Sequence, residues 1–276
     1  MNQTIVDCQN LIKIHKQGNL EVVALHGLDF TMQRGEFISV VGKSGAGKST
    51  LLRILAGLDV PSAGKVSVAD VSLTDINQRD MTKHYRRRVG FLWQDFSRNL
   101  LPYLKVQQNI ELPMLLAGVG GRERKQRAGN LLEATGLQNL AHATIHTMSG
   151  GQQQRLALCV ALAGAPELLL ADEPTGELDT ETSLEIYELL RSLNREGLSI
   201  LVVTHDVVLA KRSDRVVRLT DGRLASQGAG EEYYVAVDAT GAVALPRDLL
   251  LAAGIERAAS AKLTPDGILI EHREDT

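Results

Sequence analysis

The residues from Gly42 to Thr50 form a glycine-rich stretch whose composition suits it to bind phosphate groups. The stretch follows an apolar run at 37–41 and precedes a segment of helical character at 51–55, so we expect it to connect a buried strand to a helix. Glycines let successive backbone N–H groups point at one anion, and the N-terminus of the helix adds partial positive charge. Lys48 can then reach the β- and γ-phosphates of a nucleoside triphosphate, and the Ser49 hydroxyl can ligate Mg²⁺. The residues expected around the phosphates are Gly42, Ser44, Gly45, Ala46, Gly47, Lys48, Ser49 and Thr50.

Two adjacent carboxylates, Asp172 and Glu173, follow the apolar run at 168–171. An acid at the C-terminal edge of a strand can hold Mg²⁺ through water, which is the task expected of Asp172. Glu173 is then placed to polarise a water that attacks the terminal phosphate. An acidic cap at the start of a helix is the structural alternative. The pair favours hydrolysis of the bound triphosphate.

A second anion-binding pattern lies at 148–152, where a serine and two glycines open a predicted helix. One γ-phosphate cannot easily contact two such loops of a single chain. The second loop is therefore expected to serve a nucleotide that is bound elsewhere.

The sequence from Met148 to Arg155, Met-Ser-Gly-Gly-Gln-Gln-Gln-Arg, resembles the signature motif of the ATP-binding cassette (ABC) family. The other motifs of that family follow in the expected order over residues 4 to 224. They are the phosphate loop at 42–49, Gln94 after a strand, Asp172-Glu173, the D-loop at 176–179 and the switch histidine His205.

The resemblance implies that Gln94 senses Mg²⁺ and the γ-phosphate while its loop touches a membrane partner. Asp172 would support the metal, Glu173 would act on water, and His205 would contact the γ-phosphate and orient Glu173. The implied catalytic residues are Lys48, Gln94, Glu173 and His205, and the implied metal site contains Ser49, Gln94 and Asp172. The implied cofactors are ATP and Mg²⁺.

The same resemblance implies a homodimer in which each signature motif completes the site of the opposite subunit. Ser149, Gly151 and Gln152 would contact the partner's nucleotide, and Asp179 would couple the two sites. His15 occupies the position where the family commonly stacks an aromatic ring, usually tyrosine, on adenine. Two further departures are Met148, in place of leucine, and Val160, where arginine is common.

The pattern of apolar runs predicts an α/β fold. Short strands within residues 4–31 indicate an antiparallel β subdomain, and a helical subdomain is expected over about 97–162. Apolar runs at 168–171, 199–204 and 215–219 are typical of strands, and the first two lack alternation, as expected of parallel strands buried on both faces. The whole corresponds to the P-loop ABC cassette with a mixed-sheet core, here over residues 1–224.

Composition limits the other functions that the chain could have. It has 276 residues with a formal charge of −3, which argues against nucleic acid as a direct partner. The N-terminus has no signal-peptide pattern, and no stretch is long and apolar enough to span a membrane. Cys8 and Cys159 lie in apolar surroundings far apart, which indicates buried thiols in a reducing compartment.

The segments 100–106 and 109–118 resemble the ATPases of lipoprotein-sorting and macrolide-efflux exporters and of the related cell-division system. That resemblance implies an integral-membrane permease as partner and a cytoplasmic location on the inner face of the cell membrane. An amino-acid-type importer ATPase is the main alternative. A soluble ABC ATPase acting on DNA or ribosomes usually has long coiled coils or two cassettes, and a P-loop kinase would lack the signature motif.

The C-terminal segment, 231–276, follows a predicted linker at 225–230 and lies outside the cassette motifs. Apolar runs at 233–238, 241–247 and 268–270 predict a small β-rich domain of three strands, with a turn between the first two, a short helix at 248–254 and the final strand around 266–267. The segment 238–248, with its glycine turn and Leu245-Pro246-Arg247, resembles the swapped-hairpin fold of AbrB-type regulators and antitoxins, and a simple β appendage is the alternative. The C-terminal segment as a whole has four basic and nine acidic residues, the wrong balance for binding a phosphate backbone, so we expect a dimerisation module.

Overall fold

The computed structural model describes most of the cassette and part of the C-terminal segment. The described residues are 3–17, 20–76, 80, 87–176, 178–228, 243, 245, 250, 253, 255, 259–264 and 267–272.

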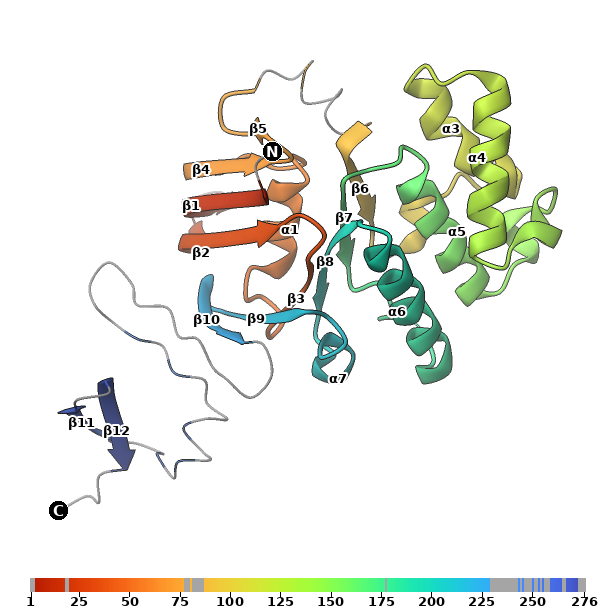
Figure 1. Ribbon diagram of the computed structural model, residues 1–276. Helices are drawn as coiled ribbons and strands as arrows, with labels where there is room; N and C mark the ends of the chain where they lie inside the picture. The colour runs from red at the N-terminus through yellow and green to blue at the C-terminus, as the bar shows by residue number, and fades with distance from the viewer. Residues whose placement is uncertain are drawn as a thin grey trace.

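The central element is a mixed six-stranded sheet with the order β10-β9-β3-β8-β7-β6 (Figure 1). Strands β3, β6, β7, β8 and β9 pair in parallel, and β10 pairs antiparallel with β9. The strands β3, β7 and β8 are buried along their whole length, which explains their continuous apolar sequences. The bounds are β3 Phe37–Val41, β6 Val89–Leu92, β7 Leu168–Asp172, β8 Ser199–Thr204, β9 Arg215–Thr220 and β10 Arg223–Gly228.

Strand β10 corrects the predicted linker at 225–230. Its backbone pairs with β9 as far as Gly228, so residues 225–228 complete the sheet, while 229 and 230 lie outside the described residues. The small and polar side chains that suggested a linker did not reveal this pairing, because an edge strand needs only one hydrogen-bonded neighbour and no apolar run.

A second sheet is antiparallel, with the order β2-β1-β4-β5. Its strands are β1 Thr4–Gln17, β2 Leu20–Gln33, β4 Ala63–Val68 and β5 Val71–Ser72. The first two are far longer than the short strands predicted, and the segments 22–25 and 28–31 belong to the single strand β2. Register shifts near Leu11, with Asn10 at φ 48° and Gly27 at φ 74°, mark bulges that interrupt the alternation of side chains. In the sequence, this interruption divides the apolar pattern of each long strand into two short runs.

Helices pack on both faces and at one edge of the central sheet. Helix α1 (Lys48–Leu55) follows β3, and α6 (Thr180–Arg195) lies between β7 and β8 in the chain. The predicted helical subdomain contains α3 (Val106–Leu116), α4 (Gly121–Ala134) and α5 (Gly150–Leu162), which Figure 1 shows gathered beyond β6. The 3-10 turns are η1 (Phe96–Asn99), η2 (Gln138–Leu140) and η3 (Ile145–Thr147), and the short helix α7 covers Val207–Ala210.

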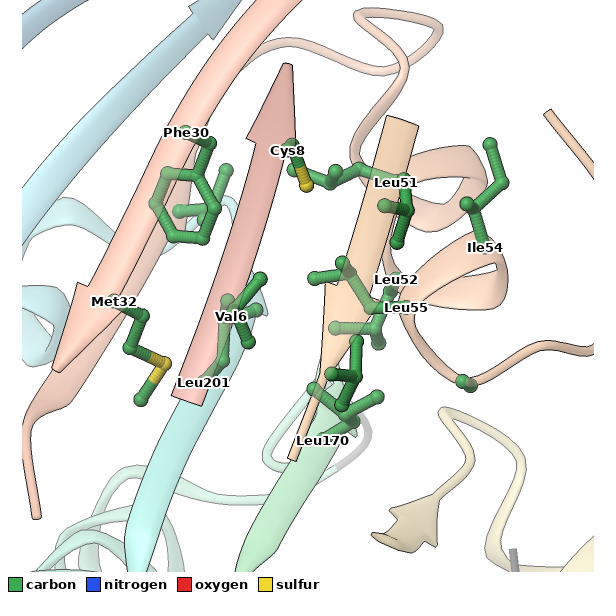
Figure 2. Packing of buried hydrophobic residues seen from close by; sticks show 14 of the residues in the cluster. Val6, Cys8, Phe30, Met32, Leu51, Leu52, Ile54, Leu55, Leu170 and Leu201 are labelled. Atoms are coloured by element: carbon green, nitrogen blue, oxygen red, sulfur yellow. The ribbon is translucent and has the colours of Figure 1, made fainter. Parts of the chain in front are cut away.

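Two hydrophobic cores lie on opposite faces of the central sheet, because side chains alternate along each strand. Ile38 and Val40 of β3 face the core shared with the antiparallel sheet and α1, whereas Phe37 faces the core shared with α6 and the helical subdomain. Figure 2 shows the first core, where side chains of β1 and β2 meet Leu51, Leu52 and Leu55 of α1. Each fully buried leucine contributes about 1.5–3 kcal/mol, so this core fixes α1 firmly behind the glycine loop.

Both cysteines are buried, as the sequence predicts. Burial raises the pKa of Cys8 to about 12 and that of Cys159 to about 11. Neither thiol is therefore reactive in the folded chain.

The C-terminal segment contains one described hairpin, β11 (Ala259–Thr264) with β12 (Gly267–His272). The predicted final strand at 268–270 is confirmed, and β11 was not predicted. The predicted strand at 233–238, most of the predicted strand at 241–247 and most of the helix at 248–254 lie outside the described residues. Within the described part of the chain, no helix is long and apolar enough to cross a membrane.

The loop between β3 and α1 needs glycine for two physical reasons. Gly47 has φ 100°, a conformation that residues with a side chain rarely adopt. A Cβ atom added to Gly47 would also lie 2.5 Å from the carbonyl oxygen of Ala24 in β2. The turn residue Gly35 has a comparable φ of 73°, but a Cβ there would meet nothing within 4 Å.

The substitutions Gly47→Ala and Gly35→Ala separate these two effects. Both should lose about 1–2 kcal/mol of unfolding free energy because of the left-handed backbone. Gly47→Ala should lose about 1–3 kcal/mol more, because its methyl group overlaps Ala24. Urea denaturation of the two variants measures the difference. Equal losses would contradict the close approach of β2 to the loop.

Candidate active site

Residues from distant parts of the sequence line one cleft with a volume of about 520 Å³. The parallel register causes this meeting, because β3, β7 and β8 end at the same edge of the sheet and each leads directly into a predicted motif. The lining residues are His15, Val22, Val23, Ala24, Ser44, Gly45, Gly47, Lys48, Ser49, Thr50, Gln94, Glu173 and His205. Two predicted loop residues, Gly42 and Ala46, are not among them.

Lys48 is buried in the glycine loop. Its ammonium group donates hydrogen bonds to the carbonyl oxygens of Gly42 at 2.8 Å and Lys43 at 3.1 Å. Gly42 allows the loop to approach β9, since a Cβ there would lie 2.2 Å from the Leu219 carbonyl. The loop thus holds the Lys48 ammonium group at the N-terminus of α1. The ammonium charge and the helix terminus both favour an anion there.

Asp172 lies beside Ser49, whose hydroxyl donates to its carboxylate at 3.2 Å. Burial raises the pKa of Asp172, although the hydrogen bond from Ser49 opposes the shift. A buried carboxylate next to a hydroxyl is a pair of hard oxygen donors, with the amide of Gln94 at the same cleft. These donors fit Mg²⁺, whose charge would offset the cost of burying the carboxylate.

Glu173 and His205 form the second polar pair of the cleft. The Nδ1 atom of His205 lies 3.0 Å from the Glu173 carboxylate, which also accepts from the His205 backbone N–H at 3.2 Å. Glu173 has φ 47°, unusual for a residue with a side chain, and its N–H donates to Val203 at 2.8 Å. Backbone strain of this kind is common at functional sites. Because Nδ1 is engaged, Nε2 is the ring nitrogen that can contact a phosphate.

His15 and two valines form the remaining wall of the cleft. His15 pairs with Val22 across β1 and β2, and Val22 and Val23 are exposed. The imidazole also lies 3.4 Å from the Thr50 hydroxyl. An imidazole beside exposed apolar side chains can stack against the flat face of a base. Val22 and Val23 could not be predicted as cleft residues, because their place beside His15 depends on the bulged register.

The predicted signature and D-loop residues do not line this cleft. Ser149 caps α5, where its hydroxyl accepts from the N–H of Gln152 and the Gln152 side chain accepts from the N–H of Ser149. Asp179 caps α6 by accepting from both the N–H and the hydroxyl of Thr182. These hydrogen bonds lower the pKa of Asp179.

Thr182 connects these two motifs. Its methyl group would lie 2.8 Å from a Cβ added to Gly151, so only glycine fits beside it without displacement. Gln154 donates to the Pro174 carbonyl at 2.6 Å, and Arg155 pairs with Glu185. The signature helix is therefore fixed to the segment that follows Glu173. Glu177, within the D-loop, lies outside the described residues.

Both departures near the signature motif lie in apolar surroundings. Met148 is buried in the core of the helical subdomain, where it replaces one apolar side chain by another. Val160 lines an apolar groove with Leu112, Pro113 and Leu116. An arginine at position 160 would place a charge in that groove.

Comparison with known proteins agrees with this geometry. The family model described as "ABC transporter" matches residues 25–176, just over half of the chain. The uncharacterized ABC transporter ATP-binding protein YbbA of Escherichia coli (strain K12) is 45% identical over 223 residues, which are 80% of this chain and 97% of YbbA. The macrolide export ATP-binding/permease protein MacB 2 of Aeromonas hydrophila is 36% identical over 88% of this chain, which spans only 37% of that protein.

A solved structure is similar over most of the chain. It is the dimeric structure of a post-hydrolysis state of the ATP-binding cassette MJ0796, from Methanocaldococcus jannaschii, bound to ADP and Pi. It has 37% sequence identity and a TM-score of 0.75, and it covers 82% of this chain and 99% of that one. The glycine loop, Glu173 and His205 line one cleft, and Asp172 lies beside Ser49 of that cleft. By these comparisons, the chain belongs to the ABC transporter family as an ATP-hydrolysing subunit.

Proposed function

We propose that two copies of this chain close around two ATP molecules and drive a separate membrane permease of the exporter or mechanotransmission type. The observation that carries the proposal is the division of the motifs between two places. Lys48, Glu173 and His205 line the cleft, whereas Ser149 and Asp179 do not. A second copy would supply the signature motif to each cleft, and the dimeric state named for MJ0796 supports this arrangement.

In the proposed reaction, Lys48 and the N–H groups of the glycine loop bind the phosphates of ATP. Ser49, Asp172 and Gln94 would hold Mg²⁺, which neutralises charge on the phosphates. Glu173 takes a proton from the attacking water, and His205 keeps the Glu173 carboxylate in position while contacting the γ-phosphate. The strained backbone of Glu173 fixes its carboxylate before the nucleotide binds.

A groove on the helical subdomain supports the proposed permease contact. It has a volume of about 270 Å³, and Leu101, Leu112, Leu116 and Val160 line it. Asn99 also lines it, accepts from the N–H of Trp93 and donates to the Phe91 carbonyl. A permease segment in the groove would therefore touch a residue fixed to the backbone next to Gln94. Association with the cytoplasmic face of the membrane follows from this contact.

The C-terminal segment is proposed to hold the two cassettes together. Among the described residues, the sheet of β11 and β12 has two strands. Ile268 and Leu269 are both exposed, and because successive residues face opposite sides, neither face of the hairpin is covered there. A two-stranded hairpin is marginally stable alone, so a second copy of the segment is the proposed cover. Such a contact would raise the effective concentration of one cassette near the other. We propose that this segment has the AbrB-like swapped-hairpin fold.

The roles of Glu173 and Lys48 can be separated. Glu173→Gln should bind ATP normally but hydrolyse it about 10²–10⁴-fold more slowly, because the water loses its base while the phosphate contacts remain. Lys48→Ala should instead weaken nucleotide binding. Steady-state phosphate release and ATP titration measure the two effects. Turnover by Glu173→Gln close to that of the wild type would refute its role.

The groove can be tested with two neighbouring leucines of α3 that are equally exposed. Leu116 is 56% exposed and lines the groove, while Leu115 is 53% exposed and does not. Leu116→Glu should reduce co-sedimentation with inside-out membrane vesicles from the source cells, because a charge in the groove must be desolvated. Leu115→Glu should co-sediment like the wild type. Equal binding by both variants would show that the groove is not the contact.

Removal of residues 229–276 tests the dimerisation proposal. The truncated chain keeps every cassette motif and should bind ATP like the full chain. Without nucleotide, light scattering should show a shift toward monomer, because the tail no longer holds the two copies together. The same mass with and without the tail would rule this out.

A further inference from the structure

Three buried hydroxyl groups lie on one face of the central sheet, below the turn that carries His205. Ser39 of β3 is fully buried, Thr204 at the end of β8 is 2% exposed, and Tyr187 of α6 is 1% exposed. Alternation along the strands places Ser39 with Phe37, and Thr204 with Ile200 and Val202, on the face covered by α6.

Tyr187 is fixed by its ring but not by its hydroxyl. The ring stacks against Phe37 with 6.3 Å between centroids. The hydroxyls of Thr204 and Ser39 lie close enough to the phenol oxygen to oppose the rise of its pKa. Among the described residues, however, neither this oxygen nor Ser39 Oγ finds a partner with hydrogen-bond geometry. A phenylalanine would fill the same space without burying an unsatisfied hydroxyl, so the polar group is not explained by packing.

Thr204 links this cluster to the reactive end of the cleft. Its hydroxyl accepts from the N–H of Asp206 at 3.0 Å, and the Asp206 carboxylate caps α7 by accepting from the N–H groups of Val208 and Leu209. His205 lies between these two fixed residues and holds the Glu173 carboxylate. The position of the Thr204 hydroxyl would therefore influence the backbone one residue away from the imidazole.

The electrostatic environment fixes the form of the phenol. Burial is the main cause that raises the pKa of Tyr187, and the nearby carboxylates of Asp206 and Glu173 raise it further. The group is therefore a neutral O–H, which can donate to Thr204 Oγ1.

We propose that Tyr187 is a positioning residue for ATP hydrolysis, whose hydroxyl bonds to Thr204 and so holds His205 against Glu173. A Thr204 turn in which this hydrogen bond is complete would be stabilised relative to the one described, without any contact between Tyr187 and the nucleotide. The inference rests on the proposed roles of Glu173 and His205.

The test is the ATPase reaction of the full chain with Tyr187→Phe, which keeps the ring and removes the hydroxyl. The turnover number should fall about 3- to 10-fold, the range for one ordinary hydrogen bond, with KM and melting temperature unchanged. Ser39→Ala is the matched control, because Ser39 also lies beside Tyr187 but not in the turn that bears His205, and it should turn over like the wild type. In a His205→Ala background, Tyr187→Phe should have no further effect.

Three results would overturn the proposal. The first is an unchanged turnover number in Tyr187→Phe. The second is an increase in KM or a decrease in melting temperature that accounts for the lower activity. The third is the same fold-decrease in turnover number in the presence and absence of His205. Glu173→Gln, measured in the same assay, distinguishes failure of the Tyr187 proposal from failure of the proposed roles at the cleft. If that variant hydrolyses ATP normally, the proposed roles at the cleft are wrong whatever Tyr187 does.

Discussion

The parallel pairing of β3, β8 and β7 is the constraint on which the whole site depends. Val41 pairs with Thr204, and Asp172 pairs with Val203, so the three strands end within one residue of one another. Each strand delivers a different group at that edge: the glycine loop, the paired carboxylates and the histidine. Backbone hydrogen bonds between the strands fix the distances between the three groups, so these distances do not depend on side-chain packing.

Three features that are unfavourable for stability lie at or near this edge. Asp172 is a buried carboxylate, Glu173 has a left-handed backbone, and the hydroxyl of Tyr187 lacks a hydrogen bond among the described residues. The two cores on either face of the sheet offset these costs. Such costs are common at functional sites, and the proposed mechanism uses this edge for the carboxylate that activates water and for a cation.

Much of the site was predictable because its motifs are local. A glycine loop between an apolar strand and a helix, and an acid pair after a second strand, define their chemistry within a few residues. What could not be predicted depends on pairing between distant residues. Bulges near Asn10 and Gly27 joined short apolar runs into long strands, and β10 formed without an apolar pattern. Val22 joined the cleft and Val160 the groove only through tertiary packing, and the hydroxyl of Tyr187 became notable only beside Thr204.

The most direct test of the shared site is calorimetric titration of ATP into the Ser149→Arg variant. If Ser149 serves the nucleotide of a second copy, the variant should bind its own ATP with the affinity of the wild-type monomer, because its cleft is intact. It should then fail to form the closed dimer. Loss of ATP binding by the monomer would contradict the account, since Ser149 would then belong to the cleft of its own chain.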